Sequence, residues 1–209
     1  MQILIITNKS VKQKIIMKKI ILALITIATS SIGFAQSKTE GFNKNDLFLS
    51  GSLAISSSST GDQKETSFEF NPRVGYFISD NVAIGVQAGV GGSKGKLAST
   101  TVSDESSFTA GAFARYYTSP AKKFSGIFNL GFNYFSNDDK IAKIKTTGFD
   151  LAFSPGLNYF LSNHFAIEAS YGKLGFATSK SDISGSRPTN IISLDLNLTS
   201  VSFGLVYKL

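Results

Sequence analysis

Apolar residues recur at every second position along most of this chain, and this alternation restricts the fold more than any other feature. In residues 46–56 the apolar set is Leu47, Leu49, Leu53 and Ile55, with small and polar residues between them. A period of two places alternate side chains on opposite faces of a β-strand. The pattern therefore predicts strands with one apolar face and one face of small and polar residues.

Eight segments carry this alternation, and the connections between them alternate in length. The segments are residues 46–56, 67–78, 82–91, 107–117, 128–135, 148–161, 165–172 and 191–209. Short connections are predicted at 79–81, 118–123 and 162–164, and longer ones, rich in Ser, Thr, Asp and Lys, at 57–65, 93–105, 136–146 and 177–189. Strands of about 9 to 13 residues suit a tilted crossing of a bilayer. We therefore predict an all-β, eight-stranded, antiparallel up-and-down transmembrane barrel.

A soluble eight-stranded barrel is the competing architecture, and the composition of the two faces separates them. A soluble barrel would turn the Leu, Ile, Val, Phe and Tyr face inward around a ligand. Its outer shell would then consist mainly of Gly, Ala, Ser and Asn, with few Lys and Glu. In lipid, the apolar face points outward and the closed sheet satisfies every backbone group. The membrane barrel is the better interpretation.

The N-terminus has the layout of a secretory signal peptide. Lys18 and Lys19 precede an apolar stretch, and small residues at Gly33 and Ala35 precede Gln36. The predicted domains are a signal peptide at 1–35, a short periplasmic segment at 36–45 and the barrel at 46–209. Residues 1–16 are either an upstream extension from a misassigned start codon or a long n-region of the signal.

Removal of residues 1–35 changes the charge of the chain. The whole sequence carries a net charge of +7, but five of its 21 basic residues and none of its 14 acidic residues lie in 1–35. The remaining 16 basic and 14 acidic residues give +2, which leaves no basic surface for nucleic acid. The absence of Cys excludes disulfides and thiolate metal sites. No cofactor is predicted.

Residues 71–85, NPRVGYFISDNVAIG, are echoed at 154–168 by SPGLNYFLSNHFAIE. Each copy fits two strands joined by a short polar turn at one membrane boundary. Tyrosines beside these ends are predicted to lie in the headgroup zone, where amphipathic rings are favoured. The predicted interface aromatics are Tyr76, Tyr116, Tyr159 and Tyr207.

These turns, together with FARYY from residue 113 and the terminal VSFGLVYKL, resemble the small OmpX-like outer-membrane β-barrel proteins of Gram-negative bacteria. The resemblance covers about 46–209. It implies a monomer in the bacterial outer membrane, with periplasmic termini and with outer-membrane lipid and lipopolysaccharide as partners. It also implies that the barrel-assembly machinery reads the last strand, although Leu209 stands where the family usually has Phe or Trp. The implied assembly signal comprises Phe203, Leu205, Tyr207 and Leu209.

Charged residues on the small and polar face are expected to lie inside the barrel. They are Glu69, Arg73, Arg115, Asp150, Glu168 and Asp195. Because unpaired charge in a confined interior is unfavourable, we expect the two arginines to pair with carboxylates. Such a network is either a structural filling of the lumen or an ion or proton path.

Three irregularities are predicted in the strands. Pro72 and Pro155 cannot donate to a ladder, so each should cause a bulge or a lost ladder bond. The apolar phase also changes between Leu198 and Val201, which predicts a bulge near Thr199 and Ser200.

Function is predicted to be non-enzymatic. The sequence favours a structural or surface-interaction barrel acting through four extracellular loops. A narrow channel for small solutes or apolar molecules is the alternative. A lipid A-modifying enzyme is less favoured, because His164 is the only histidine and lies in a predicted turn with no Ser directly after it.

Overall fold

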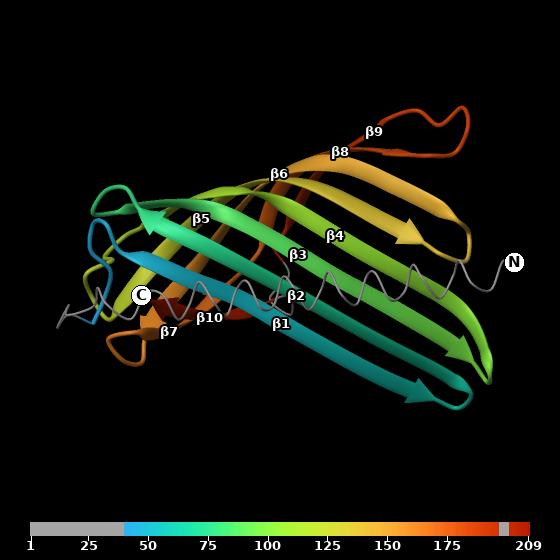
Figure 1. Cartoon of the computed structure of the whole chain (residues 1–209), viewed down its shortest axis with the longest axis horizontal. Helices are drawn as coiled ribbons and strands as arrows, with labels where there is room; N and C mark the ends of the chain where they lie inside the picture. Colours follow the sequence, from blue (N-terminus) through green and yellow to red (C-terminus); the bar gives the residue numbers. More distant parts are fainter. Residues whose placement is uncertain (1–39, 197–200) are drawn as a thin grey trace, which may run out of the picture. The chain divides into compact units, whose positions relative to one another are not determined.

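The computed structural model describes residues 40–196 and 201–209, which form an antiparallel β-barrel (Figure 1). Among these residues no helix is long and apolar enough to cross a membrane. The strands are β1 (Leu47–Thr60), β2 (Gln63–Phe77), β3 (Val82–Leu97), β4 (Thr100–Tyr117), β5 (Phe124–Asp139), β6 (Ile144–Phe160), β7 (Phe165–Ser170), β8 (Lys173–Ser181), β9 (Thr189–Asp195) and β10 (Ser202–Lys208).

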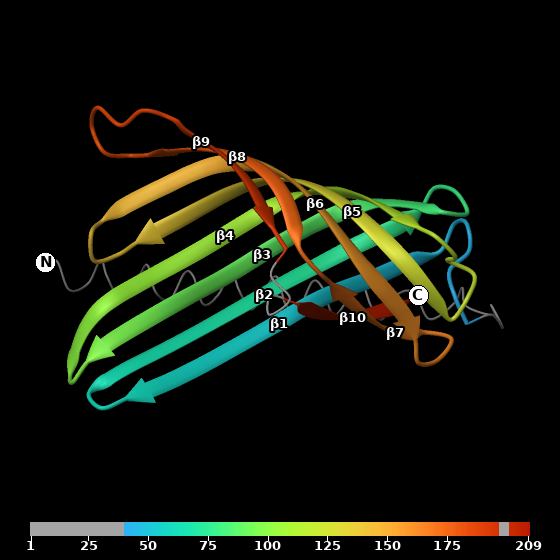
Figure 2. The same ribbon diagram turned by 180° about the vertical axis from the view of Figure 1, so that it is seen from behind.

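The strand order confirms the predicted eight-stranded antiparallel barrel. Strands β1 to β6 pair in sequence, β6 pairs with both β7 and β8, and β9 pairs with β8 while β10 pairs with β7. The seventh strand, predicted at 165–172, is therefore β7 and continues as β8 to Ser181, and the eighth, predicted at 191–209, contains β9 and β10. Strand β10 closes the ring on β1, from Phe48 opposite Lys208 to Gly51 opposite Leu205. Figure 2 shows this junction from behind.

The two ends of the barrel differ in a way that corrects the loop prediction. At one end, here called the turn end, the connections are 78–81, 118–123 and 161–164, as expected. At the other, the hairpin end, the connections are only 61–62, 98–99, 140–143 and 182–188. Most of the residues predicted as long loops extend the strands instead. A polar strand outside the bilayer keeps its ladder bonds, and its Ser- and Thr-rich composition looks like a loop in sequence.

Both prolines disturb the ladder, as predicted. The pairs of β2 with β3 run from Phe77 to Arg73 and resume at Phe70 with the same register, so the ladder pairs at Pro72 are lost without a bulge. Opposite Pro155, the break between β7 and β8 shifts the register by one residue, and the Tyr171 N–H donates to the Pro155 carbonyl at 3.0 Å. The bulge predicted at Thr199 and Ser200 lies outside the described residues.

The outer face of the barrel is apolar, and the inner face is small or polar. Large apolar side chains on the outside include Leu53, Val86 and Phe132, which are 54–65% exposed. The four predicted interface tyrosines are 37–48% exposed, and each is the second-last residue of its strand at the turn end. They therefore all lie on the outer face near the turn end, and their contact with headgroups stays a prediction.

Candidate functional site in the barrel lumen

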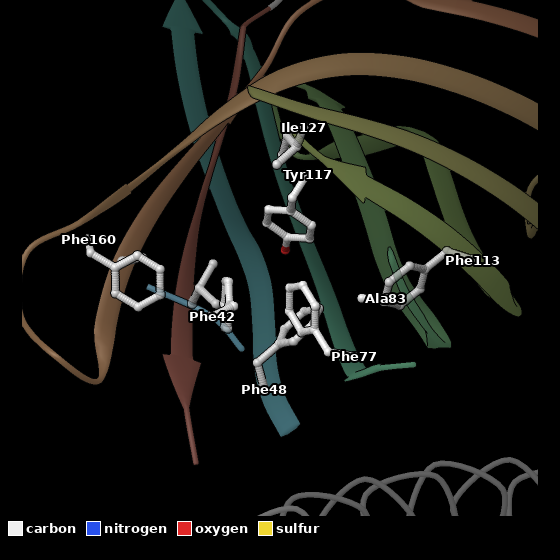
Figure 3. Packing of buried hydrophobic residues seen from close by; sticks show 10 residues of the cluster. Phe42, Phe48, Phe77, Ala83, Phe113, Tyr117, Ile127 and Phe160 are labelled. Atoms are coloured by element: carbon white, nitrogen blue, oxygen red, sulfur yellow. The ribbon is translucent and has the colours of Figure 1, made fainter. Parts of the chain in front are cut away.

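An aromatic plug fills the lumen at the turn end. Phe42, from the segment before β1, is 1% exposed and lies among rings from four strand ends (Figure 3). Its ring centroid is 5.2 Å from Phe48, 4.7 Å from Phe77, 5.4 Å from Tyr117 and 4.9 Å from Phe160. Edge-on and stacked rings at such distances pack favourably. These five rings, the aromatic plug, leave the turn end without an open lumen.

Backbone and side-chain contacts hold the Phe42 segment in this position. The Phe42 N–H donates to the Pro120 carbonyl at 2.7 Å, and Lys208 Nζ donates to the Gly41 carbonyl at 2.6 Å. Gly41 has a φ of 145°, and a Cβ there would lie 2.5 Å from the Ala121 carbonyl carbon. Only glycine fits this approach. The short N-terminal segment predicted at 36–45 is therefore partly built into the barrel.

A buried ion pair lies next to the plug inside the lumen. Arg115 is 1% exposed and its Nη1 lies 2.6 Å from Glu168 Oε2, while Arg73 Nη1 lies 3.9 Å from Glu168 Oε1. Arg115 also donates to Asn129 Oδ1 and to the Tyr117 hydroxyl, both at 3.3 Å. The Arg115 guanidinium lies 5.5–6.0 Å from the Phe48, Phe113 and Tyr117 ring centroids. Arg73, Arg115 and Glu168 form the ion-pair layer, and the contacts of Arg115 with the rings join this layer to the plug.

The structure divides the six predicted lumen charges into two groups. Arg73, Arg115 and Glu168 meet in the ion-pair layer, so one carboxylate serves both arginines. The other three, Glu69, Asp150 and Asp195, line a cavity of about 470 Å³ on the hairpin side of that layer. Its lining also includes Arg73 and the amides of Asn71, Gln87, Asn129 and Asn133. The lumen therefore contains a polar cavity above a closed floor.

Amide side chains order the carboxylates of this cavity. Gln87 Nε2 donates to Asn133 Oδ1, and Asn133 Nδ2 donates to Asp150 Oδ2 at 3.2 Å. On β2, Asn71 Nδ2 donates to Glu69 Oε1 at 2.8 Å. Among the described residues, neither Glu69 nor Asp150 has a basic nitrogen within 4.0 Å. The two arginines therefore pair with Glu168 and not with Glu69 or Asp150.

Sequence reasoning missed the plug, although a signal for it was present. Each predicted interface tyrosine is followed by a residue that points inward: Phe77, Tyr117, Phe160 and Lys208, all of them buried. In both copies of the repeated turn, the tyrosine therefore lies on the outer face and the phenylalanine after it lies in the plug. Phe42 itself lies outside the alternating segments and carries no such signal.

The remaining predicted residues lie on the outer face or in turns. Phe203, Leu205 and Tyr207 of β10 are 71%, 65% and 37% exposed, and Leu209 follows the strand. Recognition of these four residues by the barrel-assembly machinery stays a prediction. His164 lies in the turn before β7, with its ring 6.1 Å from the Tyr207 ring. Within the described ranges, no cluster of three or more His, Cys, Asp or Glu could hold a metal ion.

A charge cluster stands near the hairpin end. Asp104 lies 3.2 Å from Lys94 Nζ and 2.9 Å from Lys140 Nζ. The hydrogen bond from Lys140, and then the one from Lys94, holds the pKa of Asp104 below its ordinary value. Asp104 is 12 positions before Tyr116, farther than the roughly 9 to 11 residues that cross a bilayer. If Tyr116 marks the membrane boundary as predicted, this spacing places the cluster in the part of the sheet outside the membrane.

Comparison with known proteins identifies the family of this chain and agrees with its barrel fold. The family model described as "Outer membrane protein beta-barrel domain" matches residues 20–208. The crystal structure of the outer membrane protein OprG from Pseudomonas aeruginosa superposes with a TM-score of 0.52, at 16% identity, over 82% of this chain and 99% of OprG. The N-terminal β-barrel domain of Pseudomonas aeruginosa OprF gives a TM-score of 0.44, at 11% identity, over 80% of this chain and 100% of that domain. No curated protein sequence matches the chain.

Proposed function

Because this chain belongs to the outer membrane protein beta-barrel domain family, we propose that it is a non-enzymatic barrel of the bacterial outer membrane with a structural or surface-binding role. Its turn end faces the periplasm, and its four hairpins face outward and contact the envelope, other cells or host surfaces. It inserts as a monomer with the help of the barrel-assembly machinery, and its outer face contacts lipid and lipopolysaccharide.

The closed turn end is the observation that supports this proposal. Phe42 and Arg115 are each 1% exposed, and they lie in successive layers across the lumen. A channel needs a continuous polar path, whereas these layers place an apolar plug and a buried ion pair across that path. The interior of an eight-stranded barrel is only just wide enough for side chains, so two filled layers suffice to close it.

The hairpins supply the surface for binding. The paired strands continue well past the apolar band to tight turns at 61–62 and 98–99. Residues 56–60 at the end of β1 are four serines and a threonine, all exposed. Extended, hydrogen-bonded hairpins of this kind present a more rigid surface than unstructured loops would.

Membrane location is tested first. In cell fractions, the protein is expected in the outer membrane, and an unboiled sample should migrate differently from a boiled one on a detergent gel, because a closed sheet resists detergent until heated. A soluble periplasmic pool with no heat-dependent mobility would contradict the proposal.

The surface role is tested by shortening the hairpins. Replacing 56–67 and the paired 93–105 with tight Asn-Gly turns removes the outer parts of two of the four hairpins but keeps the membrane band. Cells carrying this variant should lose most of the binding to other cells or host surfaces that cells with the native protein show. Substitution of the exposed Lys122, at the turn end, is the matched control and should leave binding unchanged.

A narrow channel is the second candidate, and the polar cavity of about 470 Å³ is the observation that favours it. Liposomes containing the native protein distinguish the two. Swelling in small polar solutes would favour the channel, whereas impermeable liposomes together with hairpin-dependent cell binding would favour the surface role.

A further inference from the structure

We propose that the polar cavity is a binding site for a small zwitterionic solute, one that carries both a carboxylate and an ammonium group. The floor and the wall of the cavity carry opposite net charge. At the floor, Arg73 and Arg115 share the single carboxylate of Glu168, which leaves one positive charge in excess. On the wall, Glu69 and Asp150 are two carboxylates held by amides.

Arg73 is the group that receives the anionic end of the ligand. Its side chain is 28% exposed and lines the cavity, whereas Arg115 is fully buried beneath it. Its 3.9 Å separation from Glu168 is too long for a good hydrogen bond, so its donors remain available. A guanidinium binds a carboxylate through two parallel hydrogen bonds, which gives orientation as well as affinity.

Asp150 and Glu69 receive the cationic end. Arg73 lies opposite Gln87 in the ladder, and the same row passes through Gly111 and Asn133 to Asp150. The donors on Gln87 and Asn133 therefore fix the Asp150 carboxylate at one side of the chamber. The Gln87 Oε1 atom is buried and makes no hydrogen bond within the described structure, which adds an acceptor for an ammonium group.

Other charges in the chamber do not remove this polarity. Lys173 of β8 and Asp195 of β9 are directly opposed in the ladder, so their charges offset each other within the cavity lining. A ligand with one end of each sign compensates the floor and the wall together, whereas a purely anionic or cationic ligand compensates only one. The aromatic plug and ion-pair layer beneath the chamber retain the ligand on the hairpin side.

Three probes of similar size test the proposal on the full mature chain folded in detergent micelles. Glycylglycine carries both charges, N-acetylglycylglycine only the carboxylate, and glycylglycinamide only the ammonium group. The side-chain amide NMR signals of Gln87 and Asn133 report binding. Glycylglycine should shift them saturably and bind about tenfold or more tightly than either single-charge probe, as one charge-assisted contact is worth at least about that factor.

Two cavity variants and one control separate this site from non-specific binding. Arg73→Met and the isosteric Asp150→Asn should each weaken glycylglycine binding about tenfold. Arg73→Met should then bind glycylglycine no more tightly than glycylglycinamide, and Asp150→Asn should bind it no more tightly than N-acetylglycylglycine. Arg187→Met, in the exposed 182–188 connection, should bind like the native chain. Heat-dependent gel mobility verifies that every variant is folded. Absent binding, equal binding of all three probes, or binding that both cavity variants retain would overturn the proposal, and none of these results bears on the surface role of the hairpins.

Discussion

Replacing Glu168 with Gln is expected to lower the free energy of unfolding by about 3–5 kcal/mol, the range measured when one partner of a buried ion pair is removed. Glu168 is 6% exposed and is the only carboxylate within 4.0 Å of either Arg73 or Arg115 among the described residues. Without its charge, two guanidiniums would share a confined interior uncompensated. Because the chain has no Trp, far-UV circular dichroism in urea, with the protein in lipid vesicles, is the measurement.

Two further variants identify the cause of this loss. Glu69→Gln changes an exposed carboxylate that accepts from Asn71, so it should change stability by about 1 kcal/mol or less. The double variant Glu168→Gln with Arg115→Met removes one buried cation as well and should recover much of the stability. If Glu168→Gln and Glu69→Gln were equally mild, the ion-pair layer would not be a structural element of the lumen.

The double variant Phe42→Ala with Arg115→Ala is expected to convert the closed barrel into an ion-conducting pore. Each single variant leaves one barrier in place: Arg115→Ala retains the aromatic plug, and Phe42→Ala retains the Arg115–Glu168 pair at 2.6 Å. Only the double variant joins the polar cavity to the turn end. Planar bilayer recordings should therefore show single-channel steps for the double variant and a flat baseline for the native chain and both single variants.

A matched pair outside the lumen controls for general loosening of the barrel. Phe124 is 53% exposed at the turn end of β5, and Arg187 lies in an exposed connection. Phe124→Ala with Arg187→Ala removes the same side chains without touching the plug or the ion pair, and it should not conduct. Steps from the native protein would show that the turn end is not closed, and steps from this control would show that loosening alone opens the barrel.

Much of the fold was predictable because lipid imposes a simple rule on each strand. Leu53 and Ile55 face outward while Ser52 and Ala54 face inward, and the same alternation placed Tyr76 and Tyr159 on the outer face. The effect of the two prolines on the ladder was predictable because a residue without an N–H loses a hydrogen bond at its own position. The hairpin end was less predictable, since solvated strands and loops share the same polar composition, and the expected long loops proved to be paired strands.

The candidate site was only partly predictable for a physical reason. Alternation identified which charges point inward, but not the height at which each one lies in a tilted, staggered barrel. The stagger brings Arg115 of β4 to Glu168 of β7, 53 positions away, and leaves Asp150 in a different layer. The aromatic plug depends on the Phe42 segment, which has no periodic signal in the sequence. Hydrogen bonds to the Pro120 carbonyl and from Lys208 hold this segment in place.

The sequence by itself determined the strands of the apolar band, the apolar outer face and the outward orientation of the four tyrosines, because each follows from the period of two and the composition of the two faces. The tertiary structure alone decided that the turn end is closed, that two arginines share one carboxylate and that a polar cavity lies above them. Those features depend on ring closure and register, which bring residues from different strands to the same height in the lumen.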